Sequence, residues 1–269
     1  MIIALTIVIG LCVGSFLNVC IYRLPKEKSI VRPRSFCPSC KRQLAWYDNI
    51  PILSFLLLGG KCRSCKAKIS FRYIIVEMLT ASIFVLLTSS FGLSALTIVY
   101  TVFAALLIVA TFIDFELQII PDEITYGGMI LGLILSFAFP DLHKAISRPQ
   151  ALLSSFIGLI VGGAIIYAIA WIGTIIFKKK LERIGEEQAM GGGDVKFLAM
   201  IGAFIGFKGV LLAFIIASLF GSIIGIIEKI RAKADIIPFG PYLALGAVIA
   251  VVWGERIFSF LHKFYFPYG

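Results

Sequence analysis

The feature that most constrains this chain is its series of long apolar runs without a charged side chain. Residues 1–22 form one such run, and residues 78–113 form another of 36 residues. A helix needs about 20 apolar residues to cross a bilayer, so the longer run predicts two helices with a break at 89–92. The chain is 59% hydrophobic and only 15% charged, whereas soluble domains are roughly 45–50% apolar. This excludes a soluble domain, a disordered chain and a disulfide-rich secreted scaffold.

The remaining apolar runs predict an all-α, polytopic transmembrane helical bundle. They cover residues 124–140, 149–177, 197–207, 209–227 and 236–254, with Lys208 between the third and fourth of these. Counting residues 195–207 as a short sixth span gives about eight crossings, and counting them as a re-entrant segment gives seven. The expected partner of most of this surface is the lipid bilayer.

Basic residues predict how the chain is oriented. Residues 23–72 hold twelve Lys and Arg against two acids, Glu27 and Asp48, and cytoplasmic loops carry such an excess. The basic residues follow residues 1–22 rather than precede them, so we expect a retained anchor and not a signal peptide. The expected parts are a first transmembrane helix at 1–22, a cytoplasmic zinc-binding loop at 23–72 and a transmembrane core at 73–269. The net charge of +10 then reports topology, and we expect no nucleic-acid partner.

Two CxxC pairs lie in the polar loop, at Cys37 and Cys40 and at Cys62 and Cys65. Two such pairs about 20 residues apart predict a four-thiolate zinc site without an open coordination position, which is a structural site. Two disulfides are the alternative, although they fit a cytoplasmic loop poorly. Because the loop is too small to form a core of its own, a bound metal would supply folding energy. Cys12 and Cys20 fall within the first span and are expected to pack as small apolar residues.

Two carboxylates at span ends are the candidate catalytic groups. Asp114 ends the third predicted span, and Asp194 begins the sixth, directly after Gly191-Gly192-Gly193. Two carboxylates that share a proton can activate water and protonate a leaving amine, which is aspartic-protease chemistry. Helix polarity favours Asp194 as the ionised base and Asp114 as the protonated acid. The alternative is that each caps a helix, and Lys196 is expected to pair with Asp194 or with a lipid phosphate.

Taken together, these segments resemble the bacterial type IV prepilin peptidases. The resemblance covers nearly the whole chain and is carried by GSFLNVCIYRLP (14–25), both CxxC pairs, WYDNIPILSFLLLGGKCRSC (46–65), ISFRYIIVEMLT (69–80), DFELQIIPDEIT (114–125) and GGGDVK (191–196). A GxGD motif alone also occurs in presenilin-like and signal-peptide-peptidase-like proteases. The paired CxxC motifs and GSFLNV separate the prepilin peptidases from these.

The resemblance implies an integral-membrane aspartic endopeptidase of the bacterial inner membrane. It implies that Asp114 and Asp194 are the catalytic pair, with Gly191 and Gly193 in the GxGD motif and Lys196 in support. The implied substrate is a type IV prepilin or pseudopilin, whose basic leader is cleaved at the cytoplasmic face. Many members also N-methylate the new N-terminus with S-adenosylmethionine, an activity associated with the part that corresponds here to residues 14–80, although no methyl-donor fingerprint is visible.

Other functions stay open on the residues alone. A transporter or channel with a zinc-bound loop would place carboxylates near the membrane midplane, whereas these lie at span ends. A methyltransferase with structural aspartates, and a zinc-ribbon scaffold without activity, are further alternatives. Loss of leader cleavage on changing either aspartate to asparagine would separate the protease from all three.

Overall fold

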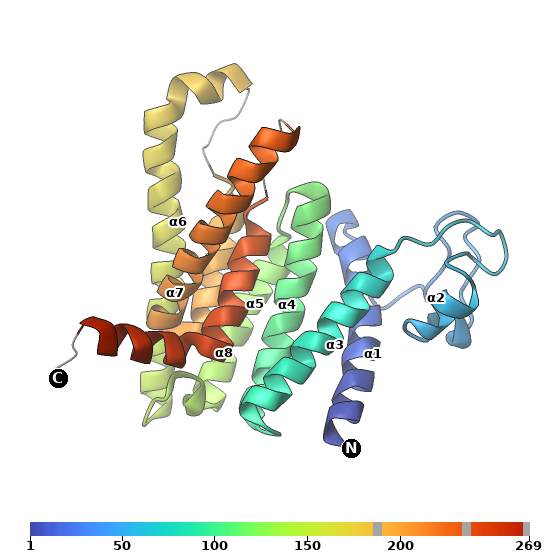
Figure 1. Cartoon of the computed structure of the whole chain (residues 1–269), viewed down its shortest axis with the longest axis horizontal. Helices are drawn as coiled ribbons and strands as arrows, with labels where there is room; N and C mark the ends of the chain where they lie inside the picture. The colour runs from blue at the N-terminus through green and yellow to red at the C-terminus, as the bar shows by residue number, and fades with distance from the viewer. Residues whose placement is uncertain (185–189, 233–237, 266–269) are drawn as a thin grey trace. The chain divides into compact units, whose positions relative to one another are not determined.

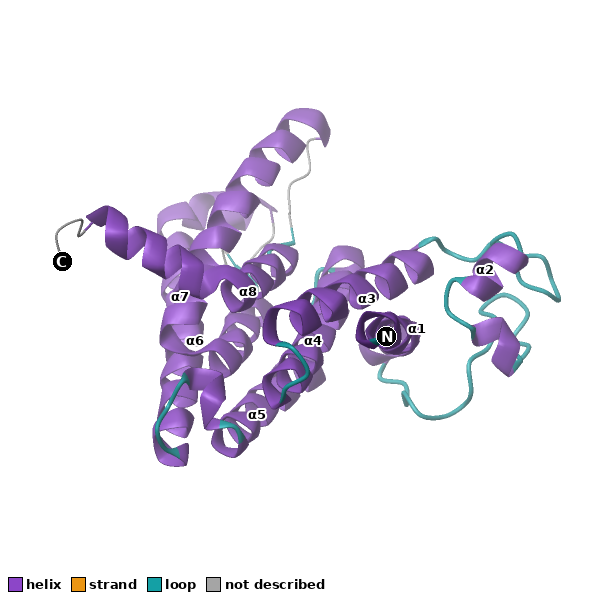
Figure 2. Cartoon of the chain, turned by 60° about the horizontal axis from the view of Figure 1, so that its bottom comes forward, coloured by secondary structure: helices purple, strands orange, loops and turns teal. Residues whose placement is uncertain are grey.

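Every secondary-structure element named in the described part of the chain is a helix. The computed structural model describes residues 1–184, 190–232 and 238–265, and these contain helices joined by loops and no strand (Figures 1 and 2). The chain divides into two compact units, Met1–Phe112 and Ile113–Gly269. The division falls within helix α4 (Ala95–Leu117).

The first unit is built on two helices that run side by side, α1 (Ile2–Arg23) and α3 (Arg72–Phe91) (Figure 1). Gly14 permits their close approach, since a Cβ atom there would lie 2.7 Å from the Cα atom of Glu77. Small residues at helix contacts are a general means of packing helices in membranes, where no hydrophobic effect drives them together. The loop that joins α1 to α3 along the chain contains only short helices: η1 (Leu24–Lys26), η2 (Trp46–Asn49) and α2 (Leu53–Leu57).

The expected break in the 36-residue apolar run is confirmed. Helix α3 ends at Phe91, and α4 begins at Ala95. Gly92 between them has φ +66°, a backbone conformation that favours glycine. The chain therefore reverses here at a residue without a side chain.

The second unit packs its helices around α7 (Gly192–Ala232). Helices α5 (Asp122–Ala138), α6 (Arg148–Ile184) and α8 (Gly240–Tyr265) each contact α7, and η3 (Pro140–His143) joins α5 to α6. Residues 197–204 of α7 are buried without interruption, and Phe197, Leu198, Met200 and Phe204 are fully inaccessible. A helix that is apolar and buried all round lies at the centre of its bundle.

A single glycine interrupts α7. Gly206 has φ +67° and ψ −176°, a region that is essentially restricted to glycine. His143 packs against this point, and its Nε2 atom lies 2.8 Å from the hydroxyl of Ser136. Burial lowers the pKa of His143 to about 4, so the ring is neutral at pH 7. In the sequence, Lys208 separates two apolar runs, and the helix is interrupted two residues before it.

The helices match the predicted transmembrane bundle. Six described helices are long and apolar enough to cross a membrane. Helix α5 has 17 residues, and the break at Gly206 divides α7 into two segments. The all-α polytopic fold is thus confirmed, and the number of spans agrees approximately.

Replacing Gly206 by alanine should lower the stability of the second unit. The new Cβ atom would lie 2.9 Å from Nδ1 of His143, and the backbone conformation would cost about 1–3 kcal/mol. Gly127→Ala is the matched control, because its Cβ atom meets nothing within 4 Å and the change favours the helix by about 0.5–1 kcal/mol. Thermal unfolding in detergent should show a lower Tm for Gly206→Ala only. An equal Tm for the two variants would contradict the role of Gly206.

Candidate functional site

Each CxxC pair forms the same backbone turn. The N–H of Cys37 donates to the carbonyl of Arg42, and the N–H of Lys41 donates to the carbonyl of Cys37, at 2.9 Å each. The second pair repeats this pattern with Cys62, Lys66 and Ala67, at 2.9 and 3.0 Å. Lys41 and Lys66 both have φ +59°. This repeated turn directs two thiols of each pair to one side, as tetrahedral metal sites require.

The two turns bring all four thiols together. The sulfur atoms of Cys37, Cys40, Cys62 and Cys65 lie within 4.8 Å of one another. Backbone N–H groups of Cys65 and Ser64 lower the pKa of the Cys62 thiol to about 6, and the N–H of Cys40 lowers the pKa of Cys37. The thiolate is the form that binds metal. The tetrad could therefore hold a metal ion, as its spacing predicted.

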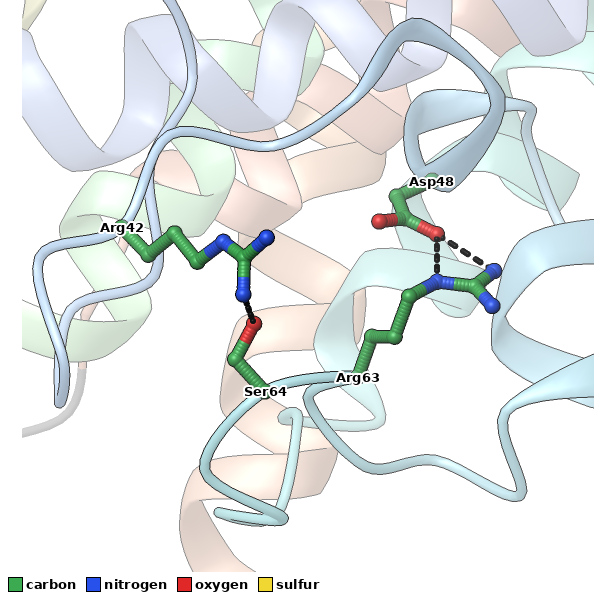
Figure 3. A network of polar contacts seen from close by, with 4 residues as sticks. All are labelled: Arg42, Asp48, Arg63 and Ser64. Atoms are coloured by element: carbon green, nitrogen blue, oxygen red, sulfur yellow. Dashed lines mark hydrogen bonds and ion pairs between the residues drawn. The ribbon is translucent and has the colours of Figure 1, made fainter.

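Polar contacts join the two turns to each other and to η2 (Figure 3). Arg42, beside the first turn, donates to the hydroxyl of Ser64 within the second at 3.0 Å. Arg63 donates its Nε–H to Asp48 at 2.9 Å and pairs with the same carboxylate through Nη2 at 2.8 Å. These contacts are exposed and individually weak, so they orient the turns more than they stabilise them.

A buried carboxylate ties the loop to α3. Glu77 is 5% exposed, and its Oε2 atom accepts the backbone N–H of Ile52 at 2.8 Å. Ile52 has φ +59°, which is unusual for a β-branched residue and costs about 1–3 kcal/mol. The hydrogen bond to Glu77 compensates for part of this strain. The sequence gave no indication of the contact between Glu77 and Ile52, which lie 25 positions apart.

The second unit brings Asp114 and Asp194 into one neighbourhood. Asp114 is buried in the last turn of α4, and Asp194 lies in the first turn of α7. The two carboxylates interact electrostatically. Helix α4 ends at Leu117, followed by Gln118 at φ +55°, so Asp114 does lie at a helix end as expected. The acid and base roles assigned from helix polarity stay a prediction.

Glycines lie close to both aspartates and leave room for neighbouring backbone. The N–H of Gly240, the first residue of α8, donates to Oδ2 of Asp114 at 2.9 Å. A Cβ atom on Gly240 would lie 2.6 Å from the same oxygen. In the GxGD motif, Gly191 accepts the N–H of Asp194 at 3.1 Å, and Gly193 packs on Ile120. Ends of α4, α7 and α8 thus meet around the pair.

The counter-ion of Lys196 is Asp122. Its Nζ atom lies 2.6 Å from Oδ1 of Asp122 and 5.1 Å from the ring centroid of Tyr126. The pair joins the first turn of α5 to α7, one turn from the catalytic candidates. The sequence had left Asp194 or a lipid phosphate as its partner. Asp122 is the first residue of α5.

Sequence reasoning missed Gly240. It lies 46 positions after Asp194, and no periodicity connects the two. The available signal was the segment Pro238-Phe239-Gly240-Pro241 directly before the last helix, since a glycine between prolines often marks a backbone that must come close to another group. The catalytic roles of Asp114 and Asp194 and the supporting role of Lys196 stay predictions.

The chain matches two family profiles. Residues 8–91 match the one described as the bacterial peptidase A24 N-terminal domain, and residues 101–226 match the type IV leader peptidase family. The first match contains the cysteine tetrad. The second contains both aspartates and the GGGD segment.

Several characterised proteins are similar over most of this chain. A Myxococcus xanthus protein named prepilin leader peptidase/N-methyltransferase is 38% identical over 220 residues, which are 82% of this chain and 61% of that protein, less than two thirds of its length. An Escherichia coli protein, named type 4 prepilin-like proteins leader peptide-processing enzyme, is 35% identical over 93% of each chain. A Pseudomonas aeruginosa prepilin leader peptidase/N-methyltransferase is 33% identical over 94% of this chain and 90% of its own. No solved structure matches the chain.

The cysteine tetrad predicts a bound metal ion that depends on all four thiols. Cys62→Ser should remove the ion, because it leaves three thiolates around a cation that prefers four ligands. Cys12→Ser is the control, since Cys12 is exposed on α1, outside the cluster. Elemental analysis of the purified protein gives the metal content. Retention of the ion in Cys62→Ser, or its loss in Cys12→Ser, would contradict this assignment.

Proposed function

Because the chain belongs to the type IV leader peptidase family, we propose that it cleaves the basic leader from type IV prepilins or pseudopilins and N-methylates the new N-terminal residue. The observation that carries the peptidase half is the meeting of Asp114 and Asp194 at helix ends. The pair acts as an aspartic endopeptidase. Six apolar helices make the chain a multi-pass membrane protein.

The carboxylate pair supplies both proton transfers of peptide hydrolysis. One carboxylate takes a proton from water as the water oxygen attacks the scissile carbonyl carbon. The protonated partner then gives its proton to the leaving nitrogen as the C–N bond breaks. Like charges at close range cannot both ionise easily, so the pair shares one proton and titrates as a unit. Gly240 orients Asp114 through its N–H.

The position of the pair suits a substrate that is part leader and part membrane helix. Both aspartates lie at the ends of apolar helices, where a peptide bond at the junction between a soluble leader and a transmembrane segment would lie. The excess of basic residues at 23–72 supports a cytoplasmic location for that loop. We therefore assign the enzyme to the bacterial inner membrane, with its active site facing the cytoplasm.

The proposed metal is zinc in a structural role. Four thiols within 4.8 Å fit a tetrahedral ion and leave no position for a substrate. Zinc then stabilises a loop that otherwise holds only short helices. Lys196 and the glycines Gly191 and Gly193 position the peptidase residues, and they take no part in the bond changes.

The relatives are named as N-methyltransferases, and we infer from this activity that the methyl donor is S-adenosylmethionine. When bound, it would supply an electrophilic methyl group to the new N-terminal amine.

Asp114→Asn and Asp194→Asn should each abolish leader cleavage. An amide can neither accept the water proton nor share one with its partner, and we expect a loss of about 10²–10⁴-fold or more. The measurement is the intact mass of a prepilin with a basic leader after incubation with the purified chain in detergent. Asp141→Asn, at an exposed carboxylate in η3, should cleave normally. Cleavage by either aspartate variant would contradict the proposal, whereas methylation of an already cleaved substrate should persist.

Gly240→Ala should impair cleavage without unfolding the chain. The added methyl group would lie 2.6 Å from Oδ2 of Asp114, so the carboxylate must move, and a shift of about 1 Å can cost roughly 10²-fold in rate. Gly254→Ala, in the same helix, is the control because its Cβ atom meets only a flexible leucine side chain at 3.6 Å. Initial rates of leader removal compare the two. Equal rates would mean that the position of Asp114 is not critical.

A further inference from the structure

The last turns of α8 leave the helix bundle of the second unit. Up to Gly254, α8 packs on α7, with Gly246 against the backbone of Ala213. Beyond Gly254 the described side chains are exposed, apart from the half-buried Ile257. Figure 1 shows this end of α8 running across the direction of α6, and Figure 2 also shows it projecting from the other helices of its unit. We call residues 253–264 the terminal segment of α8.

The terminal segment has one apolar face and one polar face. Successive residues of a helix are rotated by about 100°, so the sequence gives the position of each side chain around the axis. An arc of about 100° holds the large apolar side chains of Trp253, Ile257, Phe260, Leu261 and Phe264. The opposite side holds the polar residues Glu255, Arg256, Ser259, His262 and Lys263. A helix surrounded by hydrocarbon has no use for a polar face, and α8 is the least apolar of the six described helices that could cross a membrane.

The apolar face of the terminal segment is open in the second unit. Phe260 is 67% exposed and Phe264 is 69% exposed, and their rings stack with centroids 6.4 Å apart. Apolar surface of this kind marks a contact with a membrane or a partner. A helix that lies in the plane of the membrane interface satisfies both faces at once, because its apolar side enters the acyl region and its polar side meets headgroups and water.

The charges of the terminal segment favour an anionic partner. Its one acidic residue, Glu255, forms an ion pair with Lys144, the residue after η3. That pair leaves Arg256 and Lys263 as the positive charges of the segment, and both are exposed. Basic residues on an interfacial helix attract anionic lipid headgroups. The pair with Lys144 also holds the segment beside the loop that joins α5 to α6.

We propose that the terminal segment of α8 lies in the membrane interface and binds the headgroups of anionic phospholipids. Its apolar face enters the boundary between headgroups and acyl chains, and Arg256 and Lys263 face the headgroup phosphates. On the orientation proposed above, this is the outer leaflet, because Asp114 accepts the N–H of Gly240 at the other end of α8. The terminal segment thus anchors α8 at the end opposite to the carboxylate pair.

The position of the segment is tested by the fluorescence of a tryptophan placed on each face. Phe260→Trp adds the ring to the apolar face, and Ser259→Trp, at the adjacent residue, is the matched control on the polar face. Both are made in the full-length chain, reconstituted in vesicles, and the emission of the unchanged chain is subtracted because it already contains three tryptophans. Lipids brominated near the headgroup should quench the added emission of Phe260→Trp more than lipids brominated near the end of the acyl chain. They should quench Ser259→Trp little.

Two results would overturn the interfacial position. Equal quenching at residues 259 and 260 would mean that hydrocarbon surrounds the segment, which would then cross the bilayer. Little quenching at either residue would mean that protein covers the apolar face, and a dimer in detergent would identify that cover as a second copy of the chain.

The choice of lipid is tested in the Phe260→Trp chain with a small fraction of brominated phosphatidylglycerol in phosphatidylcholine vesicles. Quenching should exceed that by brominated phosphatidylcholine at the same fraction. Adding Arg256→Gln and Lys263→Gln should weaken this preference by about 10- to 30-fold, as expected for two charges near an anionic headgroup. Lys28→Gln with Lys68→Gln is the control, because it removes the same charge from exposed positions of the loop and should leave the preference unchanged.

The outcomes of the lipid experiment do not depend on the proposed function. Equal quenching by the two brominated lipids would overturn the headgroup assignment, and so would an equal loss of preference in the loop control. Leader cleavage can fail while the terminal segment still selects phosphatidylglycerol, and the reverse also holds.

Discussion

The structure depends on the need to satisfy every backbone N–H and C=O group inside a medium without water. Helices do this internally, and only their first and last turns leave groups unpaired. Polar chemistry in such a chain is therefore concentrated at helix ends. Asp114 lies in the last turn of α4, Asp194 in the first turn of α7, and Gly240 offers the free N–H at the start of α8. The carboxylate pair uses groups that the helices cannot satisfy themselves.

The loop outside the apolar helices meets the opposite problem, since water competes for all its polar groups and it holds no core. Its order comes from local devices: two identical CxxC turns, the hydrogen bonds of Arg23 and the bond between Glu77 and Ile52. Glu77 also lies at the α1–α3 contact, opposite Gly14. The same carboxylate thus connects helix packing in the apolar part to the backbone of the loop, and a cavity remains between them.

Patterns local in sequence were predictable, and contacts between distant helix ends were not. The apolar runs, the break at 89–92 and the CxxC turns each follow from a short segment. Lys208 separates two apolar runs in the sequence, but the backbone leaves helical geometry at Gly206, where φ is positive. The contact of Gly240 with Asp114 and the pair of Lys196 with Asp122 depend on how helices pack.

The two candidate sites differ in what they demand of the chain. Peptide hydrolysis needs two carboxylates close together, and glycines at 191, 193 and 240 provide the space by omitting side chains. A metal site needs four thiols brought together, which two repeated turns of the loop provide. Neither arrangement requires residues of the other unit. Each site can therefore be altered by substitution without a change in the residues of the other.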